Sequence, residues 1–540
     1  MMAIKSDENR IVWNVNKVDS GLVTTDSVLP ILLDAVKSLV EEFHPSQCRS
    51  LQYYDLIAGS WCINFLHVIY INWAEVLGCS IDYSNAEVEV ANDSFDFIHA
   101  ASWKNHFHEN MKKMIFGALS GSINLGKELG KSNYYIKNRV SENNDWRKKA
   151  LKSLSSSNPR LLITLPYIKC PPTEWAKLMY DWRKWASWND LAYPVECSGR
   201  IDIEWRLKRV RERLPANNFE QLILALLPLY IPALFLEGSA AFRNNVLSLN
   251  IKRPKAVYSA LGLHSHHVFK SLLAEWREDG THLLYHQHGG CYGMDKVHTS
   301  ERYEASVSNR FYTYGWTDER PNVIPLSPQS LSGYRASRKK WSATLLGIDW
   351  PRHTSFLAFS PAAYAGSIEI KTDLIDFLRS YPTPERLLIR PYPHEGPWGI
   401  REAMKEAAPL ASFDAGHKRP FHSFAESHMV VHSYLSTGWL ETISLNIPTV
   451  CFYDPNFYSF RPSAQYWIDK LERIGVLHRS GQAAAKFISN LGDDPQGWWN
   501  GHDVRVVIEG FRAQYANFST DWKGEWKREF ESAIDEYNQQ

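Results

Sequence analysis

The sequence lacks the features that would place it in several common protein classes. Its 540 residues carry 60 Lys and Arg against 59 Asp and Glu, so it has no charge excess of the kind that draws a protein to nucleic acid. The seven cysteines form no CxxC pair, and their number is odd. This pattern differs from that of a zinc knuckle or a disulfide framework and is typical of a reducing cytoplasm.

Long apolar segments are also scarce. The N-terminus, MMAIKSDENRIVWNV, carries charges where a signal peptide needs an apolar run. The longest apolar stretch, LILALLPLYIPALFLEG (222–238), is interrupted by Pro228 and Pro232 and falls short of the roughly 20 residues that span a membrane. The sequence therefore predicts a soluble cytoplasmic protein, at most peripherally associated with a membrane.

Aromatic and basic residues gather in one segment, residues 173–215. Such a mixture suits an anionic membrane surface or a lipid-bearing acceptor. It equally suits a solvated helix whose tryptophans pack inward. The sequence leaves these two interpretations open.

The order of the predicted elements indicates two nucleotide-binding-type domains. The first 250 residues read as mostly helical, with a long, buried helix at 53–77. From about residue 254, strands at 255–262, 281–287 and 310–316 alternate with helices, which predicts a parallel sheet. After a basic connection at 332–341, a second alternation follows.

We therefore expect an α/β protein of the GT-B glycosyltransferase class, in which two Rossmann-like domains face each other across a cleft. The expected N-terminal, acceptor-side domain covers 1–335, with a helical start and a Rossmann-like part from about 254. A donor domain for a nucleotide-sugar covers 345–495, and helices at 496–540 pack back on the N-terminal domain. The strands expected in the donor domain are 354–360 (TSFLAFS), 386–393, 411–414, 429–433 and 448–454.

The segment VVHSYLSTGWLETISLN (430–446) predicts an anion site. A buried strand runs into a polar loop that opens a helix, and the free N–H groups and hydroxyls at a helix start suit a nucleotide phosphate. The candidate ligands are Ser433, Ser436 and Thr437, and Glu441 one turn further on is placed for a ribose or sugar hydroxyl. An ordinary Ser/Thr helix cap is the alternative.

A second candidate site follows the strand at 386–393. Arg390 at the strand end suits a phosphate or a sugar carboxylate, which it would bind through two parallel hydrogen bonds. Tyr392 and His394 come next, and His394 would donate to the phosphate oxygens as the leaving group departs. The alternative is a proline-stiffened turn with a surface histidine.

The loop HQHGGCYGMDKVHTSERYE (286–304) concentrates the most reactive residue types. Gly289 and Gly290 permit a close approach to a ligand, and His288 lies just beyond a strand end, where a general base is expected. The glycine spacing matches neither a Walker loop nor a dinucleotide fingerprint. His286 and His288 share a strand face, but nothing else has metal-ligand spacing, so we expect neither a metal nor a cofactor.

Two glutamates close the same loop. Glu301 and Glu304 are three residues apart and share one face if residues 299–307 are helical. A carboxylate at the cleft would serve as base or nucleophile in transfer through an oxocarbenium-like centre. Two solvated helix carboxylates are the alternative. The sequence does not distinguish between the two glutamates.

With these residues in view, the chain resembles a family of bacterial surface-polysaccharide transferases from O-antigen and capsule loci. The resemblance rests on YYDLIAGSWCINFLH (53–67), QHGGCYGMDKVHTSERYEASVSNRFYTYGW (287–316), RPYP (390–393) and GWWNGHDV (497–504). It spans nearly the full length, and the second block is specific. The sequence departs from the family pattern at Tyr54, Ser60, Asn309 and Tyr314, which would signal a different acceptor or donor.

The resemblance implies a glycosyltransferase that builds a bacterial surface glycan. His288, Glu301 and Glu304 would face the anomeric carbon. The acceptor-side loop would comprise Gln287, Gly289, Gly290 and Tyr292. The acceptor would be a glycan or lipid-linked glycan, reached from the cytoplasm or the cytoplasmic face of the inner membrane.

The family is similar in turn to capsule transferases that use CMP-activated acidic sugars such as Kdo or a nonulosonate. By that analogy His394, Ser436 and Thr437 would hold the CMP phosphate, and Arg390 would meet the sugar carboxylate. Two alternatives remain open. One is a polyol-phosphate transferase of the teichoic-acid type that uses a CDP-polyol, and the other is a non-catalytic polysaccharide assembly subunit.

Overall fold

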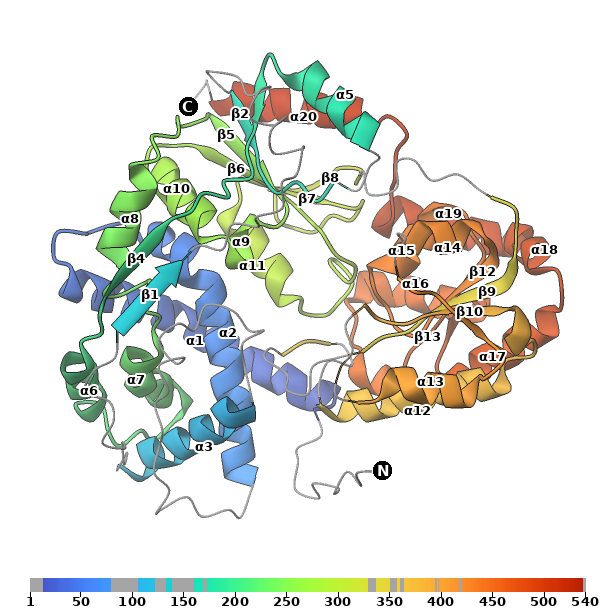
Figure 1. Ribbon diagram of the computed structural model, residues 1–540, viewed down its shortest axis with the longest axis horizontal. Helices are drawn as coiled ribbons and strands as arrows, with labels where there is room; N and C mark the ends of the chain where they lie inside the picture. The colour runs from blue at the N-terminus through green and yellow to red at the C-terminus, as the bar shows by residue number, and fades with distance from the viewer. Residues whose placement is uncertain are drawn as a thin grey trace.

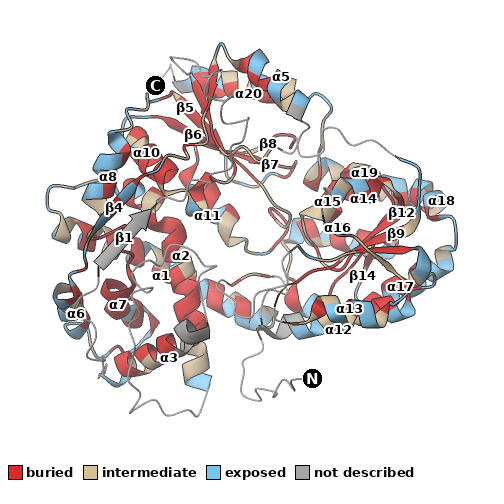
Figure 2. Ribbon diagram, viewed as in Figure 1, coloured by how far each residue is buried: buried red, intermediate tan, exposed pale blue. Residues whose placement is uncertain are grey.

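A computed structural model of the chain describes residues 13–78, 105–121, 133–137, 160–168, 172–328, 337–349, 357–359, 364–393, 396, 398–416 and 420–537. In this part of the chain, two six-stranded parallel sheets lie side by side, with a helical layer built mainly from the N-terminal residues beside the first sheet (Figure 1). The strands are buried, whereas the surrounding helices expose one side (Figure 2).

The helical layer is built around α2, whose side chains are apolar on nearly every side. α2 is long and apolar enough to cross a membrane by length and composition, and 72% of its apolar window is buried inside the protein. An antiparallel strand pair, β1 and β4, accompanies the helices. These elements are α1 (Val15–Phe43), α2 (Leu51–Gly78), α3 (Asn105–Ser120), β1 (Asn133–Lys137), β4 (Glu196–Arg200), α6 (Ile203–Arg211), α7 (Phe219–Tyr230) and α8 (Ser239–Leu247).

The first sheet has the order β3-β2-β5-β6-β7-β8, and its neighbouring strands are parallel. Its elements are β2 (Leu161–Ile163), α5 (Pro172–Trp182), β3 (Ala186–Trp188), β5 (Ala256–Ser259), α9 (Gly262–Ser265), α10 (His267–Glu278), β6 (His282–His286), α11 (Thr299–Val307), β7 (Arg310–Thr313) and β8 (Val323–Pro325). The strands predicted from residue 255 onward are confirmed. The sheet begins earlier than the predicted start near 254, because β2 and β3 belong to it.

The second sheet has the order β11-β10-β9-β12-β13-β14 and is also parallel. α12, α13 and α17 cover one face, while α15 and α16 pack on the other. Its elements are β9 (Trp341–Leu346), α12 (Tyr364–Ser380), η4 (Pro384–Arg386), β10 (Leu387–Arg390), α13 (Ile400–Ala407), β11 (Ser412–Phe413), α14 (Pro420–Ala425), β12 (Ser427–His432), α15 (Thr437–Ser444), β13 (Thr449–Phe452), η5 (Pro455–Phe457), α16 (Pro462–Arg473), β14 (Leu477–His478) and α17 (Gly481–Leu491).

The first strand of the second sheet was predicted in the wrong place. β9 lies at Trp341–Leu346, directly after the basic connection, and the described part of the predicted strand 354–360, residues 357–359, is not a strand. Thr344 is buried in β9, where its hydroxyl is 2.6 Å from that of Ser427, so a polar side chain interrupts the apolar pattern. The apolar residue Leu357 instead packs on the helical layer, with its amide donating to His67 Nδ1 at 3.1 Å.

The last helix crosses back to the first sheet. α18 (Pro495–Asn500) and α19 (His502–Tyr515) stay with the second sheet, whereas α20 (Trp522–Tyr537) lies against the first (Figure 1). Trp526 and Phe530 pack there with Trp182 and Trp188 of the segment 173–215, so those tryptophans face inward. The two doubly wound sheets and the returning helix confirm the α/β GT-B fold.

Candidate active site

The loop that follows β6 takes its shape from Gln287. Its buried side chain accepts hydrogen bonds at Oε1 from the Tyr314 amide (3.0 Å) and the Trp316 indole N–H (2.9 Å). Its Nε2 donates to the Gly289 carbonyl at 2.8 Å. Gln287 therefore holds the loop against the end of β7, and its side chain is engaged within the protein.

Gly290 brings this loop onto the start of α15 in the other half of the molecule. Its amide donates to Thr437 Oγ1 at 2.8 Å, and an added Cβ would lie 2.7 Å from the carbonyl carbon and oxygen of Ser436. The Cys291 thiol lies 3.5 Å from the Leu435 carbonyl oxygen, toward which it donates. The histidine-glycine loop and the predicted phosphate loop are therefore in direct contact.

Gly290→Ala is expected to destabilise the folded protein by about 1–3 kcal/mol, because the new methyl group would force backbone apart where the two halves touch. Thermal unfolding would measure the effect. Gly289→Ala is the matched control, since a Cβ there would come no closer than 3.4 Å to another atom. Equal losses of melting temperature in the two variants would contradict the close approach.

Three side chains surround the carboxyl group of Glu304 on α11. His264, from the turn after β5, places Nε2 2.6 Å from Glu304 Oε1, and the Tyr292 hydroxyl donates to the same oxygen at 3.2 Å. His288 Nδ1 lies 3.7 Å from it. β5 and β6 are parallel neighbours, so the segments after them meet at one edge of the sheet. The fold thus brings His264 and Glu304, which are 40 residues apart in the sequence, into contact.

The members of this cluster differ in their access to solvent. The Glu304 side chain is fully buried, whereas the His288 side chain is 25% exposed. The inner nitrogen of His288, Nδ1, faces Glu304 and the Tyr292 hydroxyl. Within the part of the chain that the structure describes, no hydrogen bond engages His288 Nε2. His288 therefore presents a free ring nitrogen in front of a buried carboxyl group.

Burial sets the protonation of the cluster. It lowers the pKa of His288 against the attraction of Glu304, and it lowers the pKa of His264 to about 4. It raises the pKa of Glu304 to about 8. Near neutral pH the cluster thus holds two neutral imidazoles around a largely protonated carboxyl group. A neutral His288 is able to accept a proton.

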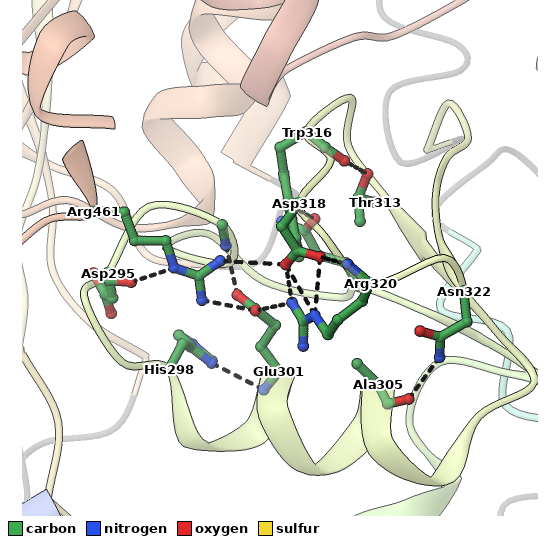
Figure 3. A network of polar contacts seen from close by, with 12 residues as sticks. Asp295, His298, Glu301, Ala305, Thr313, Trp316, Asp318, Arg320, Asn322 and Arg461 are labelled. Atoms are coloured by element: carbon green, nitrogen blue, oxygen red, sulfur yellow. Dashed lines mark hydrogen bonds and ion pairs between the residues drawn. The ribbon is translucent and has the colours of Figure 1, made fainter. Parts of the chain in front are cut away.

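Glu301 has a different environment, although it lies only three residues before Glu304. Its Oε1 accepts hydrogen bonds from Arg320 Nη2 (2.7 Å) and Arg461 Nη2 (2.8 Å), and its Oε2 accepts one from the Gly293 amide (2.7 Å). Asp318 pairs with both arginines, so two carboxylates and two guanidinium groups meet (Figure 3). Glu301 is the buried centre of an ion-pair network.

This network also joins the two halves. Arg461 occupies the N-cap position of α16 in the second half, and besides Glu301 its side chain binds the Asp295 carbonyl through Nε at 3.0 Å. Nearby, the Lys296 amide donates to the Ser459 carbonyl at 2.8 Å. Glu301 and Glu304 were predicted as equivalent candidates. The structure directs Glu301 to this interface and Glu304 to the histidines, so Glu304 is the carboxyl group that contacts His264 and His288.

The donor-side residues predicted after β12 lie at the carboxyl edge of the second sheet. The Ser436 hydroxyl caps α15 by accepting from the Gly438 amide at 3.2 Å, and the Ser433 hydroxyl donates to the Leu346 carbonyl at 2.9 Å. Glu441 is buried in α15 and raises the pKa of Tyr314 from across the interface, after burial and Tyr167.

The second predicted donor segment is only partly described. Arg390 Nη1 donates to Asp414 Oδ2 at 2.5 Å, so its charge is already balanced. The Tyr392 side chain is exposed and lies close enough to Tyr434 to raise the pKa of its hydroxyl, although burial is the larger cause. His394 lies outside the described residues.

A cavity of 330 Å³ opens at the carboxyl ends of β12 and β13. It lies beside the point where the strand order of the second sheet reverses, between β9 and β12, which is where doubly wound sheets bind ligands. Four carboxylates give it a surface that accepts hydrogen bonds from hydroxyl groups. Its lining includes Glu369, Asp373, Asp376, Ser433, Tyr453, Asp454 and Arg479.

Metal ligation has no support in these groups. Among the residues that the structure describes, no three His, Cys, Asp or Glu side chains are arranged to hold a metal ion. Metal-free transfer stays a prediction.

The sequence analysis missed His264 and Arg461. His264 stands in a histidine-rich stretch, LGLHSHH (261–267), that follows a predicted strand, and the same strand-end argument used for His288 would have found it. Arg461 follows SF in an aromatic loop with no recognisable pattern. Its partner Glu301 is 160 residues away, so only the folded chain reveals the pair.

Comparison with protein families gives one match over most of the chain. The model of the LIC12162 family transferase matches residues 14–530. No curated protein matches the sequence.

Two solved structures can be aligned with the chain at low similarity. One is the spinosyn rhamnosyltransferase SpnG complexed with spinosyn aglycone, at 9% identity, with a TM-score of 0.32 over 66% of this chain and 97% of that one. The other is a mutant O-GlcNAc transferase from Thermobaculum terrenum, at 9% identity and a TM-score of 0.32 over 95% and 99%. The fold assignment rests on the strand order described above.

Proposed function

Because the chain belongs to the LIC12162 family of transferases, we propose that it moves a sugar from a nucleotide-activated donor to a hydroxyl group of a glycan acceptor. The observation that carries this proposal is the position of His288. Its free Nε2 stands at the carboxyl edge of the first sheet, in the loop whose Gly290 touches the start of α15. A candidate base and a helix start suited to an anion therefore lie close to the contact between the two halves of the molecule.

The reaction follows from this arrangement. His288 Nε2 takes the proton of the acceptor hydroxyl while the hydroxyl oxygen bonds to the anomeric carbon of the donor. The bond between that carbon and the phosphate oxygen breaks, and the nucleotide leaves with the bonding electrons. Glu304 and His264 lie behind His288 and act as positioning residues. The charge that forms on His288 is stabilised by Glu304, whose own pKa it lowers.

The donor would lie along the second sheet. The first N–H groups of α15 and the Ser436 hydroxyl suit the phosphate, because a helix start carries partial positive charge. Thr437 Oγ1 already accepts a hydrogen bond from Gly290, and its own hydrogen remains to donate to a phosphate oxygen. The cavity beside Ser433 offers carboxylates to the hydroxyl groups of a ribose or sugar.

We take a CMP-linked ulosonic acid, such as Kdo or a nonulosonate, as the donor to test first, because the resemblance to capsule transferases implies it. A sugar carboxylate would have to compete with Asp414 for Arg390. The assignment of the acceptor to a bacterial surface glycan, free or lipid-linked, rests on the same resemblance. The cytoplasmic location and the peripheral contact with the inner membrane stay predictions from the sequence.

Nucleotide binding tests the donor side. CMP at about 100 times its Kd is expected to stabilise the protein by about 2.7 kcal/mol, which raises the melting temperature by several degrees. Ser436→Ala should weaken this effect, whereas Ser489→Ala, far from α15 in sequence and in another cavity, should not. A shift with UDP or GDP but not CMP would overturn the choice of nucleotide.

Analysis of the product tests the reaction class. Mass spectrometry of an acceptor incubated with the donor should show the added mass of the sugar alone. A product that carries the added mass of a polyol phosphate would overturn glycosyl transfer in favour of the polyol-phosphate alternative.

A further inference from the structure

A groove of 330 Å³ lies between α11 and the two long helices α1 and α2. Its volume falls within the range of roughly 300–1,000 Å³ that is usual for small-molecule sites. The three helices lie side by side in Figure 1. Most of the wall is apolar and consists of Leu29, Pro30, Leu33, Leu51, Ile63 and Leu66.

Two carboxylates, Asp26 and Asp55, interrupt this apolar wall, and Asp26 pairs with Arg302, which also lines the groove. Asp55 lines the groove, and its side chain makes no hydrogen bond with the residues that the structure describes. An added Cβ at Gly59 would lie 2.1 Å from Asp55 Oδ1. The Asp55 carboxylate therefore lies over the glycine one turn further along α2, where a larger residue would clash with it. A carboxylate with spare hydrogen-bonding capacity in an apolar groove is costly unless a partner donates to it.

The charge of Asp55 already has a counterpart. Lys270 on α10 is buried, attracts Asp55 and donates to the Ser60 hydroxyl at 3.1 Å. A cationic ligand would add a further positive charge to those that Lys270 and Arg302 already supply. A neutral hydroxyl group would instead supply the missing hydrogen bond without changing the charge. The groove therefore fits an apolar segment that carries a hydroxyl group.

The groove ends close to the reactive cluster. Tyr303 of α11 lines it, and the Tyr303 ring centroid lies 6.3 Å from that of His264. His264 in turn contacts Glu304 at 2.6 Å. One aromatic side chain thus separates the groove from the histidines of the cluster, on the half of the molecule where the acceptor is expected.

We propose that this groove binds the apolar segment of an amphipathic acceptor, with an acceptor hydroxyl group donating a hydrogen bond to Asp55. The proposal rests on the proposed function for the identity of the ligand as an acceptor. The binding itself does not depend on transfer. The site selects acceptors in which a sugar is joined to an apolar chain.

Calorimetric titration with two alkyl glucosides, and no donor present, tests the groove. Octyl β-glucoside, kept below its critical micelle concentration, is expected to bind at least tenfold more tightly than methyl β-glucoside, since each buried methylene adds about fourfold in affinity. Leu29→Gln and Asp55→Asn should each weaken octyl glucoside binding at least fivefold. Circular dichroism would verify that both variants fold.

Matched controls lie on α1, the helix that carries Leu29. Ile31→Gln and Asp34→Asn change exposed side chains of the same types outside the groove and should leave the affinity unchanged. Equal affinities for the two glucosides, or equal losses of octyl glucoside affinity in Ile31→Gln and Leu29→Gln, would contradict binding in the groove. In that event, nucleotide binding that depends on Ser436 would still support the proposed function, so the two failures are distinguishable.

Discussion

Replacing His288 by alanine is expected to lower kcat by roughly 10²- to 10⁴-fold, the usual contribution of a general base. The His288 side chain is 25% exposed and stands in front of Glu304, so its replacement removes the proton acceptor. The rate of sugar transfer at saturating donor and acceptor measures the effect. His428→Ala removes an exposed histidine elsewhere and should leave kcat unchanged.

The pH profile separates the base from the residues behind it. Because burial lowers the pKa of His288, the acidic limb of kcat should lie below about pH 6.5, the usual value for histidine. Burial raises the pKa of Glu304 to about 8, so the carboxyl group is largely neutral over this limb, and Glu304→Gln should lower kcat with little movement of the limb. Retention of the wild-type rate and profile in both variants would contradict the assignment of His288.

The fold was predictable wherever strands are apolar and helices periodic. β6, and β12 after the exposed His428, are buried on both faces, and the sequence shows them as short apolar runs followed by polar loops. β2 and β3 have only three residues each, too few for a periodic pattern. β9 was misplaced because Thr344 finds its partner Ser427 on a strand more than 80 residues away. An apolar run at Leu357 serves packing on another layer instead.

The candidate site was predictable only for residues that directly follow a predicted strand. His288 and Ser436 follow strands of the two sheets, and the structure brings their loops into contact through Gly290. The difference between Glu301 and Glu304 was not predictable. Spacing along a helix tells which side chains share a face, whereas their roles here depend on Arg461 and His264, which come from distant segments.

The same substitution should change a different property at each glutamate: the stability of the fold at Glu301 and the rate of transfer at Glu304. Glu301→Gln is expected to lower the free energy of unfolding by about 2–4 kcal/mol, because it removes the carboxylate shared by two partly buried arginines. The amide that replaces it would also turn an N–H toward donors such as the Gly293 amide. The change should appear as a drop of several degrees in the calorimetric melting temperature.

Glu304→Gln is the matched comparison, three residues further along α11. Burial raises the pKa of Glu304 to about 8, so near pH 7 the neutral amide replaces a group that is already largely neutral, and the melting temperature should change little. Its effect should fall on kcat instead. Equal losses of stability in the two variants would mean that both carboxyl groups are ionised and stabilise the fold. That result would contradict the assignment of Glu304 as a positioning residue for His288.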